Sequence, residues 1–155
     1  MGAGINVAQD FEEQNTEAFL DTMNPATSLV CDAASLAAFY EIFTQWGKTP
    51  TGQSLVSENI LKKYTSRQVF SWDRSLRIPL AVGRGFFTGS LFPSSFSWWN
   101  TTCCFGHAGG FSCLAFGEYQ TNISAAIITN ENRSASDFMK RFVPLAHGLR
   151  DTCRG

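Results

Sequence analysis

A histidine inside a glycine-rich segment is the first candidate for chemistry in this sequence. His107 is one of 2 histidines, and Gly109 and Gly110 follow it closely. An imidazole titrates near neutral pH, and glycines let backbone N–H groups approach a ligand, so the segment could combine acid–base chemistry with hydrogen-bond donors. It is predicted to be a turn directly before a strand. The alternative is a purely structural residue, which is also the interpretation of His147 near the end of the last expected helix.

The cysteines around His107 raise the questions of metal binding and nucleophilic catalysis. Cys103, Cys104 and Cys113 give the spacing C-C-x-x-H-x5-C, which lacks the two paired C-x2-C motifs of a zinc site. Neither a metal nor another cofactor is therefore predicted. The chain has 5 cysteines, an odd number, and two are adjacent, so free thiols are expected. A thiolate activated by His107 stays an alternative to the interpretation that these cysteines are small buried residues.

Four further residues are candidates for substrate binding. Arg84 lies between two glycines on a predicted strand, where its cation could meet a carboxylate without crowding. The alternative for Arg84 is an edge-strand residue that faces water. Trp98 and Trp99 lie in a loop before the glycine-rich segment and either line a pocket or close the core. Phe86 is expected to form a wall of the same cleft.

Helical periodicity predicts the elements that precede residue 77. The opening of the chain is expected to be helical up to Asn24, which stands before a proline. A second helix is predicted over residues 33–46, with Asp32 as its N-cap and Gly47 as its C-terminal stop. A short helix is predicted to open at Ser57 and to reach residue 63.

Beyond residue 77 the pattern becomes that of strands. Strands are predicted near residues 78–90, 111–117 and 123–130, the last two forming a hairpin. A final helix is predicted to be capped near Ser136 and kinked at Pro144, with one apolar face made of Phe138, Phe142, Leu145 and Leu149. The predicted fold class is α/β in the α+β sense, a mostly antiparallel sheet flanked by helices, in a single domain over residues 1–155.

Composition and charge narrow the class of partner. The 155 residues carry 12 Lys and Arg against 13 Asp and Glu, and the net charge of −1 lacks the cation excess that nucleic-acid binding requires. No apolar run reaches the roughly 18 residues of a membrane span, and the first residues do not form a secretory signal. We therefore expect a cytoplasmic protein that binds neither nucleic acid nor membrane.

Several segments together resemble the serine β-lactamase-like superfamily, which includes class C β-lactamases, esterases and lovastatin-type acyltransferases. The main one is the run F-G-H-A-G-G-F-S-C-L-A-F at residues 105–116, followed by an apolar segment at 123–130 that ends I-T-N. Further segments occur in the order of that superfamily at residues 25–40, 46–47, 52–57 and 83–86. The resemblance covers about residues 25–148 and implies part of a β-lactamase-like sheet.

The resemblance also implies roles for the glycine-rich segment. In that superfamily an H-x-G or K-T-G strand borders the active site, and the backbone N–H just past its glycine binds the oxyanion of the tetrahedral intermediate. The corresponding positions are His107, Gly109 and Gly110, which assigns catalysis to His107 and Gly110 and substrate binding to Gly109. The sequence contains neither the S-x-x-K nor the Y-x-N motif of the family. It therefore resembles a truncated half-fold without the serine nucleophile.

Two functions follow from these observations. The first is a hydrolase-like tailoring enzyme of secondary metabolism that promotes acyl transfer or lactone or pyrone closure of a polyketide. His107 would then supply acid–base catalysis, and the substrate's own hydroxyl would attack. The alternative is a non-catalytic pseudoenzyme that acts as a binding or interaction module. Because the missing half-fold would leave open a strand edge and the helix face of Phe138, Phe142 and Leu145, a homodimer is also expected.

Overall fold

The computed structural model describes residues 16–24, 29–74, 78–91, 93–99, 101–110, 112–130 and 134–154. The chain divides into two units, Met1–Cys31 and Asp32–Gly155. In the first unit the short helix α2 (Glu17–Leu20) begins after Thr16, whose hydroxyl accepts a hydrogen bond from the Phe19 N–H at 3.3 Å. The earlier part of the helix predicted for the opening of the chain lies outside the described residues.

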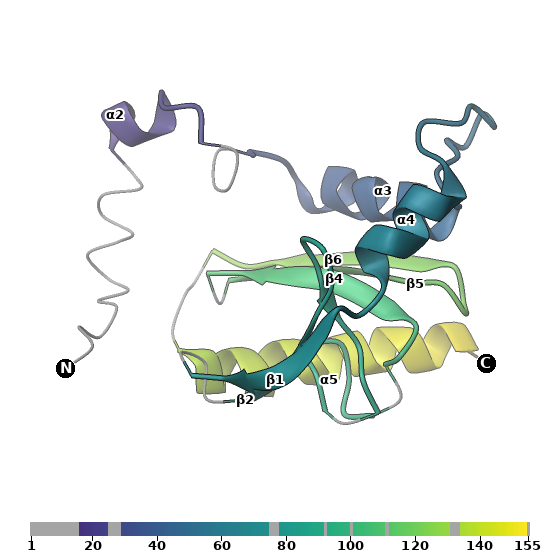
Figure 1. Cartoon of the computed structure of the whole chain (residues 1–155). Helices are drawn as coiled ribbons and strands as arrows, with labels where there is room; N and C mark the ends of the chain where they lie inside the picture. Colours follow the sequence, from purple (N-terminus) through teal and green to yellow (C-terminus); the bar gives the residue numbers. More distant parts are fainter. Residues whose placement is uncertain are drawn as a thin grey trace. The chain divides into compact units, whose positions relative to one another are not determined.

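A six-stranded antiparallel sheet forms the centre of the second unit (Figure 1). Its strands are neighbours in sequence order: β1 (Val69–Asp73), β2 (Ile78–Val82), β3 (Phe87–Thr88), β4 (Cys104–Gly109), β5 (Cys113–Glu118) and β6 (Ile123–Ile128). Each adjacent pair is antiparallel. The predicted antiparallel sheet and the predicted hairpin, now β5 with β6, are confirmed.

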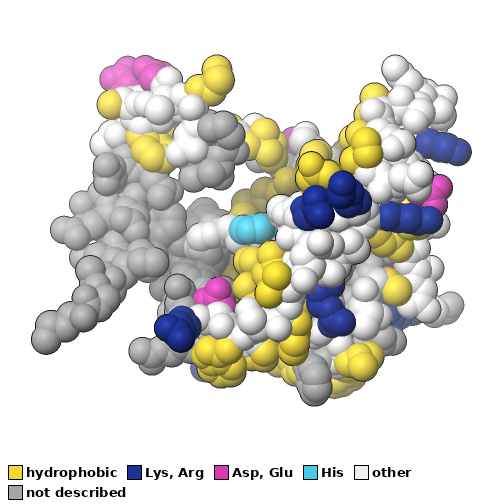
Figure 2. Space-filling view, in the orientation of Figure 1, with side chains coloured by type: hydrophobic (Ala, Val, Ile, Leu, Met, Phe, Trp, Pro, Cys, Tyr) yellow, Lys and Arg dark blue, Asp and Glu magenta, His cyan; other side chains and the backbone are white. Residues whose placement is uncertain are grey.

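Three strand predictions need correction. β1 is missing from the prediction because its side chains do not alternate between buried and exposed, and Trp72 is 63% exposed. Figure 2 shows other hydrophobic side chains that reach the surface of this face of the molecule. The segment predicted as one strand over 78–90 is two strands, β2 and β3, joined by a turn. The segment predicted as a turn forms the strand β4. Its glycine at position 106 is required by the neighbouring strand and not by a turn, because a Cβ there would lie 2.2 Å from the Ala115 carbonyl oxygen.

The two helices predicted after residue 32 are confirmed, although the first ends at Thr44 rather than at residue 46, and the helix predicted up to Asn24 ends at Leu20. Helix α3 (Ala33–Thr44) begins after Asp32, whose carboxylate accepts a hydrogen bond from the Ser35 N–H at 2.7 Å. After α3 the chain turns at Gly47, which has a φ of +84° and no room for a Cβ against the backbone of residue 56. Helix α4 (Glu58–Thr65) begins after Ser57, as predicted.

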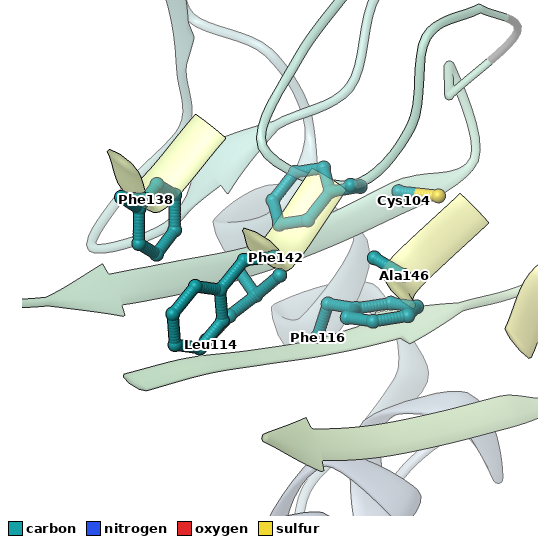
Figure 3. Close-up of a cluster of buried hydrophobic side chains, with 7 residues drawn as sticks. Cys104, Leu114, Phe116, Phe138, Phe142 and Ala146 are labelled. Atoms are coloured by element: carbon teal, nitrogen blue, oxygen red, sulfur yellow. The ribbon is translucent and has the colours of Figure 1, made fainter. Parts of the chain in front are cut away.

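Two helices cover the two faces of the sheet, α3 on one side and α5 (Ala135–Arg154) on the other (Figure 1). Because side chains alternate along a strand, β5 serves both cores. Leu114 and Phe116 face the α5 layer, whereas Ala115 packs with Tyr40 in the α3 layer. Figure 3 shows the α5-side cluster, in which the buried side chains are Phe96, Cys104, Leu114, Phe116, Phe138, Phe142 and Ala146.

The apolar face of α5 differs from the prediction. Phe138 and Phe142 are buried as expected, but Leu145 is 54% and Leu149 is 42% exposed. The buried stripe follows the spacing of four residues from Phe138 through Phe142 to Ala146 and Arg150, which turns the two leucines toward solvent. The helix begins earlier than predicted, because the Ser134 hydroxyl accepts a hydrogen bond from the N–H of residue 137 at 3.2 Å. Pro144 lies inside the helix.

A buried carboxylate attaches the β5–β6 hairpin to the C-terminal half of α5. Glu118 is 0% exposed and accepts hydrogen bonds from Arg150 Nη2 at 2.7 Å, Arg154 Nη2 at 2.6 Å and the Thr121 hydroxyl at 3.0 Å. Burial alone would raise the pKa of Glu118, but the bonds from the two arginines outweigh it and hold that pKa below the ordinary 4.5. Glu118 lies far from Arg150 and Arg154 in the sequence, so no local pattern indicates this cluster.

Candidate functional site

His107 lies on β4 with its side chain exposed. It shares a face of the strand with Phe105, which packs against Tyr40 of α3. The imidazole stacks on the ring of Phe87 in β3, with the ring centroids 4.5 Å apart and an interplanar angle of 16°. Its nitrogens form no hydrogen bond with the side chains of the described residues. Stacking thus orients a ring whose nitrogens stay accessible to a ligand.

Tyr40 supports the strand that carries His107. Its side chain is 4% exposed, and its hydroxyl forms a hydrogen bond with the backbone of His107. Burial and the neighbouring Cys113 raise the pKa of Tyr40 to about 12, and the bond from His107 only partly offsets them. Tyr40 is therefore a neutral phenol at physiological pH. In the sequence, only its hydroxyl distinguishes Tyr40 from Phe39 and Phe43 of the same helix.

Glycine is required at positions 109 and 110 for two different structural reasons. A Cβ on Gly109 would lie 2.8 Å from the Cys113 sulfur, which donates a weak hydrogen bond to the Gly109 carbonyl at 3.5 Å. Gly110 has a φ of +51°, in the left-handed region that favours glycine. The predicted order of turn and then strand is thus reversed for this segment, since β4 comes first and the turn at Gly110 follows it.

The turn between β2 and β3 carries Arg84 and Phe86. Arg84 is exposed, and its backbone N–H donates to the Tyr64 carbonyl at 2.9 Å, so it lies on a turn rather than on the predicted strand. Phe86 packs into the α3-side core, with its ring centroid 6.0 Å from that of Tyr40 and 5.7 Å from that of Phe105. Arg84 is therefore accessible to a ligand, whereas Phe86 mainly holds the α3 layer. Their part in substrate binding stays a prediction.

Trp99 lies close to α5. Trp99 meets His147 edge to face, with the ring centroids 4.9 Å apart, and Trp98 and Trp99 are 36% and 60% exposed. Among the described residues no ring contact joins either tryptophan to His107. The described residues thus show no direct stacking of Trp98 or Trp99 on His107, and the role of the two tryptophans in substrate binding stays a prediction.

His147 belongs to a series of hydrogen-bonded polar side chains that no sequence motif indicates. Its Nδ1 lies 2.8 Å from the Ser97 hydroxyl, and its Nε2 lies 3.3 Å from a carboxylate oxygen of Asp151. A serine, an imidazole and a carboxylate bonded in series can activate a nucleophile. Ser97 is 0% exposed, however, so its oxygen does not reach a substrate. We interpret the series as a tether that holds the loop around Ser97 on α5.

A pocket of about 330 Å³ lies between β2, β3, the loop at residues 93–96 and Met139 of α5. Phe87 contributes to its wall and is also the ring on which His107 stacks. The imidazole and the pocket therefore share one wall residue. The volume lies at the lower end of the range of small-molecule sites, about 300–1,000 Å³.

The thiols give little support to a cysteine nucleophile. No disulfide joins the five cysteines, all of which are among the described residues. Burial raises the pKa of Cys104 to about 12, although the charge of Arg150 acts in the opposite direction, so its thiolate does not form near neutral pH. In the described part of the chain, no three His, Cys, Asp or Glu side chains form a group that could hold a metal ion.

The comparisons with known proteins identify the fold. No protein-family description matches the sequence, and no curated protein is similar to it at a significant level. A penicillin-binding protein homolog from Caulobacter crescentus superimposes with a TM-score of 0.59 at 24% identity, over 66% of this chain and 26% of that chain. EstA from Arthrobacter nitroguajacolicus Rue61a gives a TM-score of 0.58 at 18% identity, over 81% of this chain and 32% of that chain.

A family VIII carboxylesterase gives a further likeness, with a TM-score of 0.50 at 15% identity over 72% of this chain and 30% of that chain. These neighbours have β-lactamase-like folds, so the fold implied by the sequence resemblance is confirmed as a fragment of such a fold. The chain spans about a third or less of the length of the structures it matches. Within the described residues, no helix combines the length and apolar character needed to cross a membrane.

Proposed function

We propose that this protein promotes acyl transfer or lactone or pyrone closure on a polyketide, with His107 as the acid–base group. The observation that carries the proposal is the exposed imidazole, oriented by Phe87 and placed two residues before Gly109 at the end of β4. The fold shared with part of a family VIII carboxylesterase supports a substrate that contains an acyl group. A polyketide natural product is the acyl class that we propose.

The chemistry needs no nucleophile from the protein. A hydroxyl or enol oxygen of the substrate adds to the carbonyl carbon of its own thioester, and His107 takes the proton of that oxygen. The carbonyl oxygen becomes an oxyanion, for which the Gly110 N–H is the proposed hydrogen-bond donor. The carbon–sulfur bond then breaks, and His107 returns its proton to the departing thiolate. The products are a lactone or pyrone and a free thiol. Ring closure is favoured because the two reacting groups belong to one molecule.

Turnover of a thioester-activated polyketide with a free hydroxyl, followed by mass spectrometry, tests this proposal. His107→Ala should slow turnover about 100-fold or more, as is usual for the loss of a general base. His107→Gln, which keeps a planar amide beside Phe87 but does not titrate, should be equally slow. His147→Ala is the matched control and should keep the wild-type rate. Full activity in folded His107→Ala would refute the assignment.

A binding or interaction module is the second candidate. The observation that favours it is that Ser97, the serine bonded to His147, is 0% exposed and so does not reach a substrate. Such a module would bind the same substrates without converting them. Saturable binding of the thioester with no product formed over hours would support this second function over the first.

The homodimer expected from the sequence stays a proposal with a revised surface. Phe138 and Phe142 are buried under the sheet and cannot form the interface, so that part of the expectation is wrong. The outer strand β1 instead exposes Val69, Phe70 and Trp72, and an exposed apolar edge strand favours pairing with a second copy. Sedimentation should show a dimer that Trp72→Lys weakens. A monomer at high micromolar concentration would contradict the proposal.

A further inference from the structure

We infer that the pocket between β2, β3 and α5 binds a small neutral molecule with an apolar body and one hydroxyl or carbonyl oxygen. The pocket measures about 330 Å³. This binding site is separate from the acid–base chemistry proposed for His107 and does not depend on it. A medium-chain alcohol is the simplest member of the ligand class.

The pocket walls define the apolar body of the ligand. Residues 78–81 of β2 form one side, and the other apolar lining residues are Phe87, Pro93, Phe96 and Met139. Phe96 is 0% exposed and belongs to the α5-side core, so the floor of the pocket is part of the packed interior. Transfer of an alkyl or aryl group from water to such walls is favourable in proportion to the area buried.

The remaining lining residues determine the polar part of the ligand. They are Thr88, Ser90, Ser94 and Ser95, and none of the lining residues that the structure describes carries a charge. A carboxylate or an ammonium group would lose its hydration here without gaining an opposite charge. A neutral oxygen can instead exchange hydrogen bonds with a hydroxyl. The wall chemistry therefore selects against charged ligands.

Thr88 supplies the second observation that points to a ligand. This residue is 5% exposed, and its hydroxyl oxygen is buried without a hydrogen-bond partner among the described residues. Buried polar groups in folded proteins almost always have a partner, and an unpaired one requires an explanation. Because Thr88 lines the pocket, rotation of its side chain about χ1 would turn the hydroxyl toward a ligand oxygen, which is the partner that we assign to it.

The loop that forms the outer wall is held in place before any ligand binds. Thr101, itself 0% exposed, accepts from the Ser90 N–H at 2.9 Å and donates to the Ser90 carbonyl at 3.0 Å. Its hydroxyl also lies 3.0 Å from the Ser94 hydroxyl. The tether from Ser97 to His147 fastens the same loop to α5 at 2.8 Å. A preformed wall of this kind reduces the entropic cost of binding.

Binding of the neutral fluorophore N-phenyl-1-naphthylamine to the full chain measures occupation of the pocket. The fluorescence should rise and saturate, and 1-octanol should displace the probe at concentrations at least tenfold lower than octanoate. Equal displacement by octanoate would overturn the assignment to neutral ligands. Absence of saturable binding would overturn the site.

Ser95→Phe places a phenyl ring at the pocket wall and should weaken probe binding tenfold or more. Ser54→Phe adds the same ring at an exposed position outside the pocket and is the matched control. If Ser95→Phe does not fold, Met139→Ala replaces it, because the enlarged pocket should shift the preference from 1-octanol toward 1-decanol. Unchanged binding in folded Ser95→Phe, or an unchanged chain-length preference in Met139→Ala, would overturn the location.

Thr88→Val tests the polar contact by two effects of opposite sign. Removal of an unpaired buried hydroxyl should raise the Tm of the protein without ligand. The same change should weaken 1-octanol severalfold, because the ligand oxygen loses its partner, while binding of the probe stays unchanged. Undiminished displacement by 1-octanol would overturn the contact with Thr88. His107→Ala should leave all of these results unchanged, so failure here is distinct from failure of the proposed enzymatic activity.

Discussion

The two ends of the β4–β5 hairpin differ in whether their polar side chains are buried and paired. At one end, where Cys104 pairs with Glu118, the carboxylate is buried and takes hydrogen bonds from two arginines and a threonine. At the other end, where Gly109 pairs with Cys113, the His107 ring is exposed and only stacks on Phe87. We call the Glu118 end the closed end, because its buried charge stabilises the fold. We call the His107 end the open end, because its exposed imidazole can contact a ligand.

In this fold, polar side chains that are buried and paired serve the structure, whereas exposed and unpaired ones are candidates for function. A buried charge must be neutralised within the protein, so its position is set by the partners that it needs. An exposed imidazole has no such requirement, and its position needs another explanation.

Glu118→Ala should give the largest effect, because it leaves the Arg150 guanidinium buried without its carboxylate. Removing one partner of a buried ion pair costs about 3–5 kcal/mol, and the free energy of unfolding in urea should fall by that amount. Glu58→Ala is the matched control, since its pair with Lys62 is half exposed, and it should cost less than about 1 kcal/mol. Equal losses of unfolding free energy in the two variants would contradict the structural role of the buried Glu118 ion pair.

His107→Ala should show the opposite pattern. The expected loss of turnover is about 100-fold, which corresponds to about 2.7 kcal/mol of transition-state stabilisation. The free energy of unfolding should change by less than about 1 kcal/mol, because the side chain is exposed. Glu118→Gln, assayed at a temperature where it stays folded, should keep the wild-type kcat. If Glu118→Gln slowed catalysis as much as His107→Ala, the two ends would not be separate.

Gly109→Ala should produce an intermediate loss of stability at the open end. The new Cβ would lie 2.8 Å from the Cys113 sulfur, and overpacking of this kind costs about 1–3 kcal/mol. Cys113→Ala removes that sulfur, so the double variant should recover most of the loss in urea denaturation. Gly106→Ala is the contrasting change, because its Cβ would meet the Ala115 backbone at 2.2 Å and no side-chain deletion can relieve it. Additive losses at positions 109 and 113 would show that the contact is absent.

Acidification should reduce the stability that Glu118 contributes at the closed end, and this is the smallest of the predicted effects. The pKa of Glu118 is lower in the folded protein than the ordinary 4.5 of an unfolded glutamate, so its contribution to stability is fully present above about pH 4.5. That contribution is lost as the pH falls through the lower folded-state pKa. The Tm of the wild type should therefore fall more steeply below pH 4.5 than that of Glu118→Gln. Parallel curves would refute this role of Glu118.

Local patterns predicted much of the fold because they report local physics. The cap at Asp32 and the stop at Gly47 follow from side-chain oxygens and from left-handed backbone, both of which act within a few residues. The hairpin of β5 and β6 follows from two apolar runs around a polar turn. β4 is not predictable from its own sequence, because its glycines are typical of a turn. They are required by close contact with the neighbouring strand β5.

The helices, the antiparallel hairpin, the free thiols and the glycine-rich segment that carries His107 follow from local sequence patterns. The packing of the elements is what places Trp99 beside His147 of α5, Phe86 against the α3-side core and Glu118 between two arginines. The reason is distance along the chain. Glu118 and Arg150 are far apart in sequence and meet only when the sheet and α5 pack together, and periodicity within one segment carries no record of that contact.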